Sequence, residues 1–549
     1  ERKIPASKEL KVSFDLQAGQ NDKGTLQIDF LDENGIACSR LEMTDDGTFR
    51  AKGGSRFGNM MKYEAGKTYH VEAVLSVADR NIQVSVDGKR VGLRMFYAPV
   101  ASIERIAFRT GIPRTFPTVD TPADQDYDVA DAGSQAPLVE YRIANVKTSS
   151  VDKDATSAVL KYENFARYTD YFNGMEDENI AQAIPNAQAS EWMEENIPLF
   201  ECPQHNFEEM YYYRWWSLRK HIKETPVGYG MTEFLVQRSY SDKYNLIACA
   251  IGHHIYESRW LRDPKYLDQI IHTWYRGNEG GPMKKMDKFS SWNADAVLAR
   301  YMVDGKREFM LDMKKDLDTE YKRWERTNHL SNGLYWQGDV QDGMEESISG
   351  GRKKKYARPT INSYMYGNAK ALSLMGVLSG DEGMAMTYGL KADTLKQLVQ
   401  DKLWNTRHNF FETMRTDSSA NVREAIGYMP WYFNLPDADK YDSAWKEVMD
   451  ENGFAAPYGL TTAERRHPEF RTRGVGKCEW DGAIWPFASA QTLTALGNYL
   501  NHYQPSAKND ELFRALTDSV YFRQMELYVE SQYHRGRPYI GEYLDEVTG

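Results

Sequence analysis

The sequence has no long apolar run. None of its segments approaches the roughly eighteen consecutive apolar residues that a membrane-spanning helix requires, so we expect no membrane span. The chain also begins at Glu1 without the basic and then apolar leader of a signal peptide. If the protein has such a peptide, it is not part of this sequence.

Cysteine is scarce. The 549 residues include four cysteines, Cys38, Cys202, Cys249 and Cys478, and they are scattered without a CxxC pair. Neither a zinc site nor a disulfide framework is indicated by this spacing. The cysteines therefore leave the cellular compartment undecided.

Signatures of cofactor binding are missing as well. No glycine-rich phosphate loop is present, and no His, Cys, Asp or Glu residues have the spacing of metal ligands. His253 and His254 are adjacent, but neighbouring positions on a helix face different directions and do not form a metal pair. We predict no cofactor and no metal.

Basic residues do not form a stripe. The formal net charge is -11 with an isoelectric point near 5.6, and no Lys/Arg stripe interleaves with aromatic residues, so nucleic acid is not an expected partner. The longest basic run, Arg352 to Lys355, follows two glycines. It is typical of a solvated loop, with contact to an anion or acidic sugar as the alternative.

Aromatic residues are abundant, by contrast. They make up 13% of the chain, with 13 Trp and 35 Tyr. Many must lie in cores, but Trp and Tyr also form the walls of sugar-binding clefts, where rings stack on pyranose faces. At this length we expect two or more domains or one large closed architecture.

The first 150 residues have the alternating pattern of antiparallel strands. Segments 11–16, 25–30, 69–77 and 81–86 alternate apolar and polar residues, and Asp87-Gly88 marks a hairpin turn. Short strands at this spacing predict a β-sandwich over residues 1–150. This part resembles the concanavalin-like jelly rolls of secreted carbohydrate-active enzymes. Segment 113–136 has no apolar period and is interpreted as a loop of the sandwich.

Residues 151–549 have helical periodicity. Leu395, Leu398, Val399 and Leu403 follow the i, i+3, i+4, i+8 pattern, and short loops join successive helix pairs at 304–307 and 379–383. These pairs predict antiparallel helical hairpins. Long loops rich in glycine and aromatic residues separate the hairpins, and loops of such length are usually functional.

The stretch "QDGMEESISGG" at 341–351 is crowded with negative charge. Three carboxylates, Asp342, Glu345 and Glu346, fall within five consecutive positions. One explanation is a helix start, in which Asp342 is the N-cap and Glu345 its capping-box partner. The other is that one of these carboxyl groups is a catalytic acid.

Three separated motifs resemble a known family and support the second explanation. "DGMEES", "EWDGAIWP" (479–486) and "GEYLDEVTG" (541–549) are similar to the loops of (α/α)6-toroid glycosidases related to glycoside hydrolase family 63, the mannosylglycerate hydrolase and processing α-glucosidase group, with trehalases as cousins. The resemblance implies an all-α (α/α)6 toroid at 151–549. It also implies that Glu345 is the general acid and Glu542 the general base.

The sequence departs from that family in three places. Glu345 stands where the family has Asp, so Asp342 remains a rival for the acid. The arginine that usually follows the acid is replaced, with Arg352 the nearest substitute. The chain ends at Gly549, where relatives continue into a closing helix, so we expect a ring that lacks this helix.

Several further residues are candidates for sugar binding. We predict that Trp336, Trp480 and Trp485 line one pocket, since sugar rings stack on aromatic side chains. The segment "EWDGAIWP" also places Asp481 at the pocket. Tyr364 and Asn362 stand where a loop enters a helix and could bind hydroxyl groups, with capping as the equal alternative.

We therefore expect an exo-acting, inverting glycoside hydrolase, with an α-glycoside favoured, acting on an oligosaccharide or polysaccharide. Its two carboxyls would then lie roughly 6.5 to 9.5 Å apart, leaving room for the attacking water. The alternatives are an α-L-rhamnosidase-like toroid hydrolase, a polysaccharide lyase and a non-catalytic glycan-binding protein. The resemblance implies a carbohydrate partner and a secreted or periplasmic location, and leaves the sugar, the linkage and the oligomeric state open.

Overall fold

The structure is a computed structural model that describes residues 1–53, 56–110, 138–150, 160–474, 478–504, 506 and 508–549. The described chain forms two compact units, Glu1–Lys161 and Tyr162–Gly549. The expected boundary was at 150, eleven residues earlier. The predicted loop at 113–136 lies outside the described residues.

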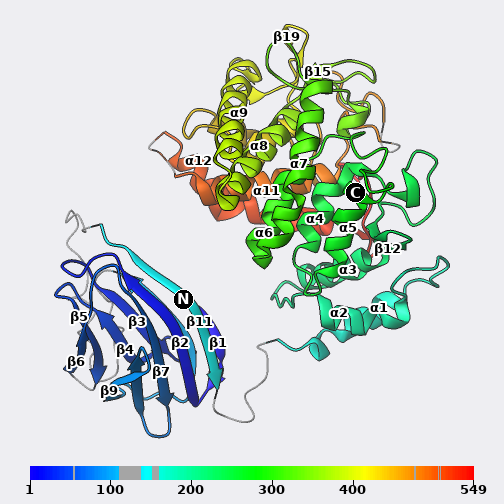
Figure 1. Cartoon of the computed structure of the whole chain (residues 1–549). Helices are drawn as coiled ribbons and strands as arrows, with labels where there is room; N and C mark the ends of the chain where they lie inside the picture. The colour runs from blue at the N-terminus through cyan, green and yellow to red at the C-terminus, as the bar shows by residue number, and fades with distance from the viewer. Residues whose placement is uncertain (54–55, 111–137, 151–159, 475–477, 505, 507) are drawn as a thin grey trace. The chain divides into compact units, whose positions relative to one another are not determined.

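The first unit is an antiparallel β-sandwich, as predicted (Figure 1). One sheet has the strand order β1-β10-β3-β4-β5-β6, and the other has the order β11-β2-β7-β8-β9. The strands are β1 Arg2–Ser7, β2 Glu9–Ala18, β3 Leu26–Leu31, β4 Ala37–Met43, β5 Thr48–Gly53, β6 Arg56–Lys62, β7 Thr68–Ser76, β8 Asn81–Val86, β9 Lys89–Met95, β10 Ile103–Thr110 and β11 Tyr141–Ser150.

Alternation of side chains builds the core of the sandwich. Every second residue of β2 is buried, and Phe14 of this strand packs edge-on against Phe108 of β10 in the opposite sheet. Asp87 and Gly88 both have positive φ, which is the two-residue turn that joins β8 to β9 without splaying the strands. The predicted strands correspond to β2, β3, β7 and β8.

The second unit is helical. Its α-helices are α1 Ala166–Asn173, α2 Ala189–Asn196, α3 His205–His221, α4 Ile251–Ser258, α5 Lys265–Arg276, α6 Asn293–Asp304, α7 Arg307–Asn328, α8 Pro359–Ser379, α9 Glu382–Lys402, α10 Met429–Tyr432, α11 Pro486–His502, α12 Asp510–Ala515 and α13 Tyr521–Glu530. A π-helix, η8 Leu516–Val520, joins α12 to α13.

Short hairpins and turns connect these helices. The strands are β12 Ile222–Thr225, β13 Gly228–Met231, β14 Trp336–Gln337, β15 Tyr356–Ala357, β16 Trp404–Asn405, β17 Phe410–Phe411, β18 Met414–Arg415, β19 Ser418–Ser419, β20 Ala455–Ala456, β21 Gly459–Leu460, β22 Tyr533–His534 and β23 Arg537–Pro538. The 3-10 helices are η1 Tyr162–Asn164, η2 Asn186–Gln188, η3 Lys243–Asn245, η4 Ala248–Ala250, η5 Val340–Asp342, η6 Ala425–Tyr428 and η7 Asp442–Val448.

Local sequence explains where the helical hairpins turn. Helices α8 and α9 lie side by side (Figure 1) because only two residues join them. Gly380 ends α8 with a φ of 73°, and the Asp381 side chain accepts from the Met384 amide at 3.0 Å as the N-cap of α9. Gly305, with a φ of 67°, ends α6 in the same way.

The helices form a closed ring, the predicted toroid. Helix α4 packs on α6, α6 on α8, α8 on α10, α10 on α11, α11 on α13, and α13 on α3. Arg214 links α3 to α4 and to α13: it donates to Glu257 of α4 at 2.7 Å and to Tyr528 of α13 at 3.0 Å. Contact between α13 and α3 does not test the expectation that a closing helix is missing after Gly549, so this stays a prediction.

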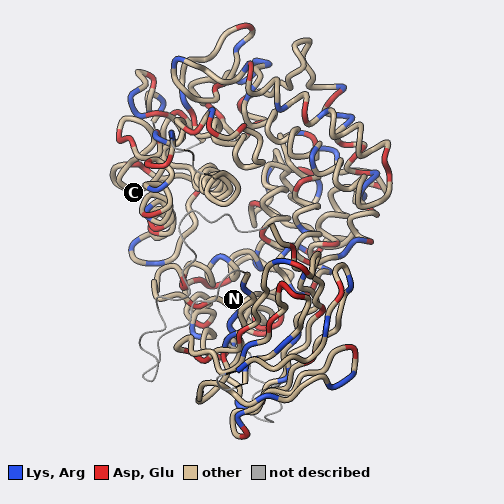
Figure 2. Tube along the Cα trace, turned by 90° about the vertical axis from the view of Figure 1, so that its left-hand side faces the viewer, with Lys and Arg blue, Asp and Glu red and all other residues tan. Residues whose placement is uncertain are grey.

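Charge of both signs is spread over the trace of the ring (Figure 2). Basic and acidic residues alternate along helix α7, for example, where Lys322 and Asp318 form an ion pair at 2.7 Å. Of the helices in the described part of the chain, none is long and apolar enough to cross a membrane.

Candidate active site

The three motifs of the sequence meet in the structure. The backbone amide of Trp480 donates to the carbonyl of Glu345 at 3.1 Å, which joins the first motif to the second. Ile484 and Leu544 exchange backbone hydrogen bonds, both at 3.0 Å, which joins the second motif to the third. Segments about 60 and 135 residues apart in the sequence therefore form one site.

The loop that carries Glu345 is folded tightly, but it is not a helix start. Asp339 caps η5 by accepting from the Val340 amide at 2.8 Å, and Gly343 ends this turn with a φ of 74°. The proposed capping box of Asp342 and Glu345 is therefore wrong, because the short helix begins before Asp342 and ends there. A Cβ at position 343 would lie 3.1 Å from the Cys249 sulfur, so the loop approaches the start of α4 closely.

Glu346 anchors the loop next to Glu345. It has a φ of 59°, an unusual value for a residue with a side chain, and its carboxylate binds Arg352 at 2.6 Å and also Arg473. Arg352, expected near the acid, thus has Glu346 as its ion-pair partner. The two arginines compensate Glu346, and neither forms an ion pair with Glu345.

Glu345 has the electrostatics of a proton donor. Burial raises the pKa of its carboxyl, and the nearby charges of Asp339 and Glu542 raise it further. The indole of Trp480 opposes this shift, although its N–H has no partner of normal hydrogen-bond geometry among the described residues. Within those residues no ion pair joins Glu345 to a cation.

Glu542 is exposed in the loop after β23. Its Oε1 lies 3.7 Å from the Cys478 sulfur, which can donate a weak hydrogen bond. Arg535 and Arg537 are near it in the sequence but form no ion pair with it in the described part of the chain. Glu542 is therefore open to solvent and close enough to Glu345 for its charge to act on that carboxyl.

A third carboxylate, Glu233, lies near Glu345 and Glu542, and no sequence motif predicted it. It follows β13, and burial raises its pKa to about 7, with the charges of Glu542 and Glu345 adding to the shift. Glu233 is exposed to solvent, although the protein around it is dense enough to desolvate its carboxyl. We call Glu233, Glu345 and Glu542 the acid cluster.

Two cysteines flank the acid cluster. Burial holds the pKa of the Cys249 thiol well above its usual range, and the charges of Glu233 and Glu345 act in the same direction. Burial raises the pKa of Cys478 to about 12. Both thiols remain protonated at neutral pH, so neither is a candidate nucleophile.

Asp342, the rival for the acid, is fully enclosed. Arg358 donates to its Oδ2 at 2.7 Å, both side chains have no exposed surface, and the Thr360 hydroxyl donates to the same oxygen. This pair fastens the loop to the first turn of α8. Asp342 therefore reaches only the protein interior, where it lines a small cavity with Trp485 and Tyr364.

Two predicted sugar ligands prove to be structural. Asn362 is buried and exchanges hydrogen bonds with the backbone of Tyr335 at 2.8 and 2.9 Å, and its amide also donates to the Arg358 carbonyl. Asp481 is also buried and accepts from the Arg473 amide at 2.9 Å and the Thr472 hydroxyl. Both assignments to the sugar pocket are wrong, because these side chains hold loops.

The three predicted tryptophans do not share a pocket. Trp480 is 1% exposed and stacks on Trp485 with ring centroids 4.6 Å apart, and Trp485 stacks on Phe487 at the same distance. Trp336 lies half-buried on β14 and lines a different hollow. Trp480 and Trp485 are core residues whose stack supports the acid loop, and Tyr364 is buried too, accepting from Gln491 at 2.9 Å.

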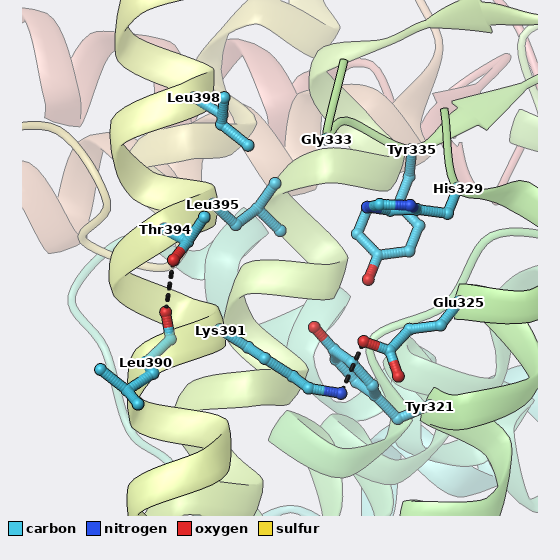
Figure 3. Close-up of a pocket in the computed structure, with 10 residues that line it drawn as sticks. All are labelled: Tyr321, Glu325, His329, Gly333, Tyr335, Leu390, Lys391, Thr394, Leu395 and Leu398. Atoms are coloured by element: carbon cyan, nitrogen blue, oxygen red, sulfur yellow. Dashed lines mark hydrogen bonds and ion pairs between the residues drawn. The ribbon is translucent and has the colours of Figure 1, made fainter. Parts of the chain in front are cut away.

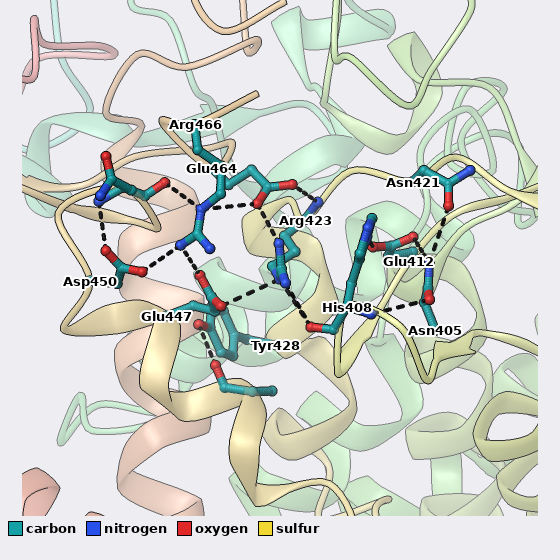
Figure 4. Close-up of polar contacts among 12 residues, drawn as sticks. Asn405, His408, Glu412, Asn421, Arg423, Tyr428, Glu447, Asp450, Glu464 and Arg466 are labelled. Carbon is teal, nitrogen blue, oxygen red and sulfur yellow. Dashed lines mark hydrogen bonds and ion pairs between the residues drawn. The ribbon is translucent and has the colours of Figure 1, made fainter. Parts of the chain in front are cut away.

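A second group of carboxylates lies in the loops around η6 and η7 (Figure 4). Arg423 binds Glu464 at 2.5 Å, and Arg466 binds both Glu447 and Asp450 at 2.6 Å. Burial raises the pKa of Glu447, and the two arginines oppose that shift. We call these five residues the paired cluster, because every carboxylate in it has a cation.

A comparison with family models assigns the chain to a protein family. The model described as mannosylglycerate hydrolase MGH1-like glycoside hydrolase domain matches residues 243–549, more than half of the chain. The chain therefore belongs to this family of glycoside hydrolases. A second model, described as Sialidase-like, CBM domain, matches residues 1–125. A search of curated proteins finds no match.

Solved structures give further similarities. A chain named "Sialidase" is 85% identical with a TM-score of 0.70; the alignment covers 100% of this chain and 50% of that one, so this chain spans about half of its length. A GH63 mannosylglycerate hydrolase from Thermus thermophilus is 13% identical over 60% of this chain and 93% of the other, with a TM-score of 0.45. A neutral trehalase from Saccharomyces cerevisiae is 11% identical over 43% and 57%, with a TM-score of 0.35.

Proposed function

We propose that this chain is an exo-acting, inverting glycoside hydrolase in which Glu345 is the general acid and Glu542 the general base. The observation that carries the proposal is the acid cluster. Two carboxylates from distant motifs lie near each other, and no ion pair joins either to a cation among the described residues. One is partly buried with a raised pKa, and the other is exposed. Membership of a glycoside hydrolase family supports the reaction class.

The two environments suit the two roles. A buried carboxyl whose pKa is raised holds its proton more readily and can give it to the glycosidic oxygen as the bond breaks, which is the part of Glu345. A carboxylate in contact with solvent can take a proton from the attacking water, which is the part of Glu542. A partly buried carboxyl with a raised pKa beside an exposed carboxylate suits this division into acid and base.

Burial argues for Glu345 over Asp342 as the acid. Asp342 is enclosed, and its Oδ2 is occupied by Arg358 and Thr360, so it has no path to a glycosidic oxygen. An acid catalyst must come within hydrogen-bond reach of the atom it protonates. Asp342 is better suited to hold the loop that positions Glu345.

Glu233 completes the proposed site. Because its pKa is raised to about 7, it can carry a proton near neutral pH and donate a hydrogen bond to a sugar hydroxyl. It lies outside the matched region 243–549.

The preferred substrate is a terminal α-linked sugar of an oligosaccharide or polysaccharide, met outside the cell or in the periplasm. A sialoside is a second candidate, since the 85% identical chain is named a sialidase and the N-terminal segment matches a sialidase-like model. The solved structures named for mannosylglycerate hydrolase and trehalase extend the panel of substrates to test.

The test is hydrolysis of a glycan panel that contains neutral α-glycosides, a sialoside, mannosylglycerate and trehalose, with the first-formed anomer read by NMR. Inversion and loss of turnover in Glu345→Gln are expected. Retention of configuration would contradict the inverting mechanism. Unsaturated products absorbing in the ultraviolet would instead identify a lyase, and binding without turnover would identify a glycan-binding protein.

A further inference from the structure

We propose that the basic run Arg352–Lys355 and Trp336 form a subsite for an acidic sugar residue, one bearing a carboxylate or a sulfate. The subsite rests on the proposed function only in that a glycan is the substrate. The sequence alone favoured a solvated loop for this run. The structure instead folds it against a hollow beside the acid loop.

The hollow has the size of a ligand site. Its volume is about 430 Å³, within the range of roughly 300 to 1,000 Å³ that small-molecule sites occupy. Helix α7 contributes the buried side chains of Trp324 and Asn328 to its lining, and β14 contributes Trp336 and Gln337. Rigid elements therefore shape two of its sides.

The basic run lines the hollow as well and is held in place. The Lys354 amide donates to the Gly351 carbonyl at 2.8 Å, which closes a turn. Directly after the run, Tyr356 and Ala357 pair with Gln337 and Trp336 as strands β15 and β14. The backbone of the run is thus fixed at both ends rather than free in solvent.

The charge of the hollow is not compensated. Lys288, Lys353, Lys354 and Lys355 all line it, and no ammonium group among them has an ion-pair partner in the described part of the chain. The only acidic residue of the lining, Asp287, is bound to Arg323 at 3.2 Å. In a protein of net charge -11, four unpaired cations around one hollow favour an anionic ligand.

An aromatic ring stands among these cations. The Lys355 ammonium lies 4.5 Å from the centroid of the Trp336 ring, so a cation–π contact directs it over the ring. The Asn328 amide donates to the Trp336 carbonyl at 3.0 Å and fixes the strand. Rings beside charged donors suit a sugar that carries an acidic group, since its ring and its charge are both recognised.

The hollow adjoins the proposed catalytic acid. Arg352 lines it, binds Glu346 at 2.6 Å, and lies close enough to Glu345 that the charge of this carboxylate raises the arginine's pKa. The hollow and Glu345 are thus linked through one short loop. An acidic residue bound here would belong to the same glycan whose bond Glu345 protonates.

Binding to the full-length Glu345→Gln variant tests this subsite by calorimetry, without turnover. The probes are tri-galacturonate, a sulfated heparin disaccharide and neutral maltotriose. We expect one or both anionic probes to bind more tightly than maltotriose, and more weakly as salt is raised. Replacing Lys353, Lys354 and Lys355 together by Ala should weaken anionic binding by about tenfold, as the loss of three exposed ion pairs implies.

The matched control is the double variant Lys370→Ala/Lys402→Ala, which removes exposed lysines of α8 and α9 that do not line the hollow. Its affinity for the anionic probes should be unchanged. Tighter binding of tri-galacturonate identifies the carboxylate as the recognised group, and tighter binding of the heparin disaccharide, which bears both groups, identifies the sulfate. Equal affinity for all three probes, an unaffected triple variant, or an equal loss in the control would overturn the subsite.

These outcomes are separate from those of the proposed function. A protein that hydrolyses glycans but binds anionic and neutral probes equally keeps the hydrolase and loses the subsite. A protein that binds anionic probes through the lysines but hydrolyses nothing keeps the subsite and loses the hydrolase.

Discussion

The acid cluster and the paired cluster are both built from loop carboxylates of the helical ring, yet they differ in how their charge is met. In the paired cluster Arg423 and Arg466 bind all three carboxylates. In the acid cluster no ion pair joins a cation to any of the three carboxylates, within the described residues. Burial then raises the pKa of Glu233 and Glu345 without an arginine to oppose it.

This difference indicates which group is built for stability and which for chemistry. Carboxylates paired with arginine in loops hold those loops together. Carboxylates kept near one another without a cation oppose folding, and such an arrangement persists where protons must be given and taken.

The same contrast holds for lysines near helix α7. Tyr321 and Glu325 of this helix line a hollow of about 210 Å³ toward α9, where Lys391 binds Glu325 at 2.6 Å (Figure 3). Trp324 and Asn328 of the same helix line the 430 Å³ hollow beside the run Arg352–Lys355. The lysines of that hollow have no ion-pair partner in the described part of the chain. Helix α7 therefore borders one hollow whose lysine is paired with a glutamate, the compensated hollow, and one whose lysines are unpaired among the described residues.

The largest expected effect comes from removing a member of the acid cluster. Glu345→Gln and Glu542→Gln should each lower kcat by about 10² to 10⁴-fold, the usual contribution of a general acid or base, because the amide cannot transfer a proton. The melting temperature should stay the same or rise, because the neutral amide removes charge repulsion within the cluster. Turnover of the substrate found in the glycan panel is the measurement, with Glu163→Gln, an exposed glutamate of η1, as the control.

Wild-type turnover in Glu542→Gln would refute the assignment of the base. Full activity in Glu345→Gln together with inactivity of Asp342→Asn would return the acid role to Asp342. A large drop in the melting temperature of Glu345→Gln would mean that this carboxylate serves structure instead.

The paired cluster should respond in the opposite way. Arg423→Ala leaves the buried Glu464 with only Arg466, 3.5 Å away, so the loss of unfolding free energy should approach the roughly 3 kcal/mol that breaking a buried pair costs. The measurement is urea denaturation of the helical unit followed by tryptophan fluorescence. The kcat of the folded fraction should stay near the wild-type value, and a catalytic loss without destabilisation would remove the contrast between the clusters.

Much of the architecture could be predicted from local patterns. Alternation located β2, β3, β7 and β8, and the helical period with glycine stops located the α8–α9 hairpin. The three motifs also came together as expected, because their resemblance to a family carries information about long-range contacts. Strands such as β5 and β6, with weaker alternation, were missed.

The side-chain roles in the site could not be predicted equally well. Trp480 looks the same in a sequence whether its ring lines a pocket or stacks on Trp485, and only tertiary packing decides. Asp342 forms an ion pair with Arg358, which is sixteen residues away in the sequence. No motif indicates this pairing. Glu233 stands in a loop without any period, so nothing local distinguishes it from a surface glutamate.

The pH dependence of stability tests whether Glu233 of the acid cluster has a raised pKa. The pKa of Glu233 is about 7 when folded against an ordinary value of 4.5, so the folded state holds a proton that the unfolded state has lost. Its contribution is therefore present below about 4.5 and is lost as pH rises through 7. The melting temperature of the wild type minus that of Glu233→Gln should fall between these values. A difference that is flat with pH would mean that Glu233 is not shifted.

The smallest effect is expected in the compensated hollow. Glu325 and Lys391 are each 30% exposed, and solvent screens an ion pair of this kind. A double-mutant cycle of Glu325→Gln and Lys391→Met should therefore give a coupling below about 1 kcal/mol, measured by urea denaturation. Neither change should alter binding of the anionic probes, because the ammonium of Lys391 is already occupied by Glu325. If Lys391→Met weakened that binding as much as the loss of Lys353, Lys354 and Lys355, pairing would not distinguish the two hollows. The argument from unpaired charge to a ligand site would then fail for lysines, although it could still hold for the acid cluster.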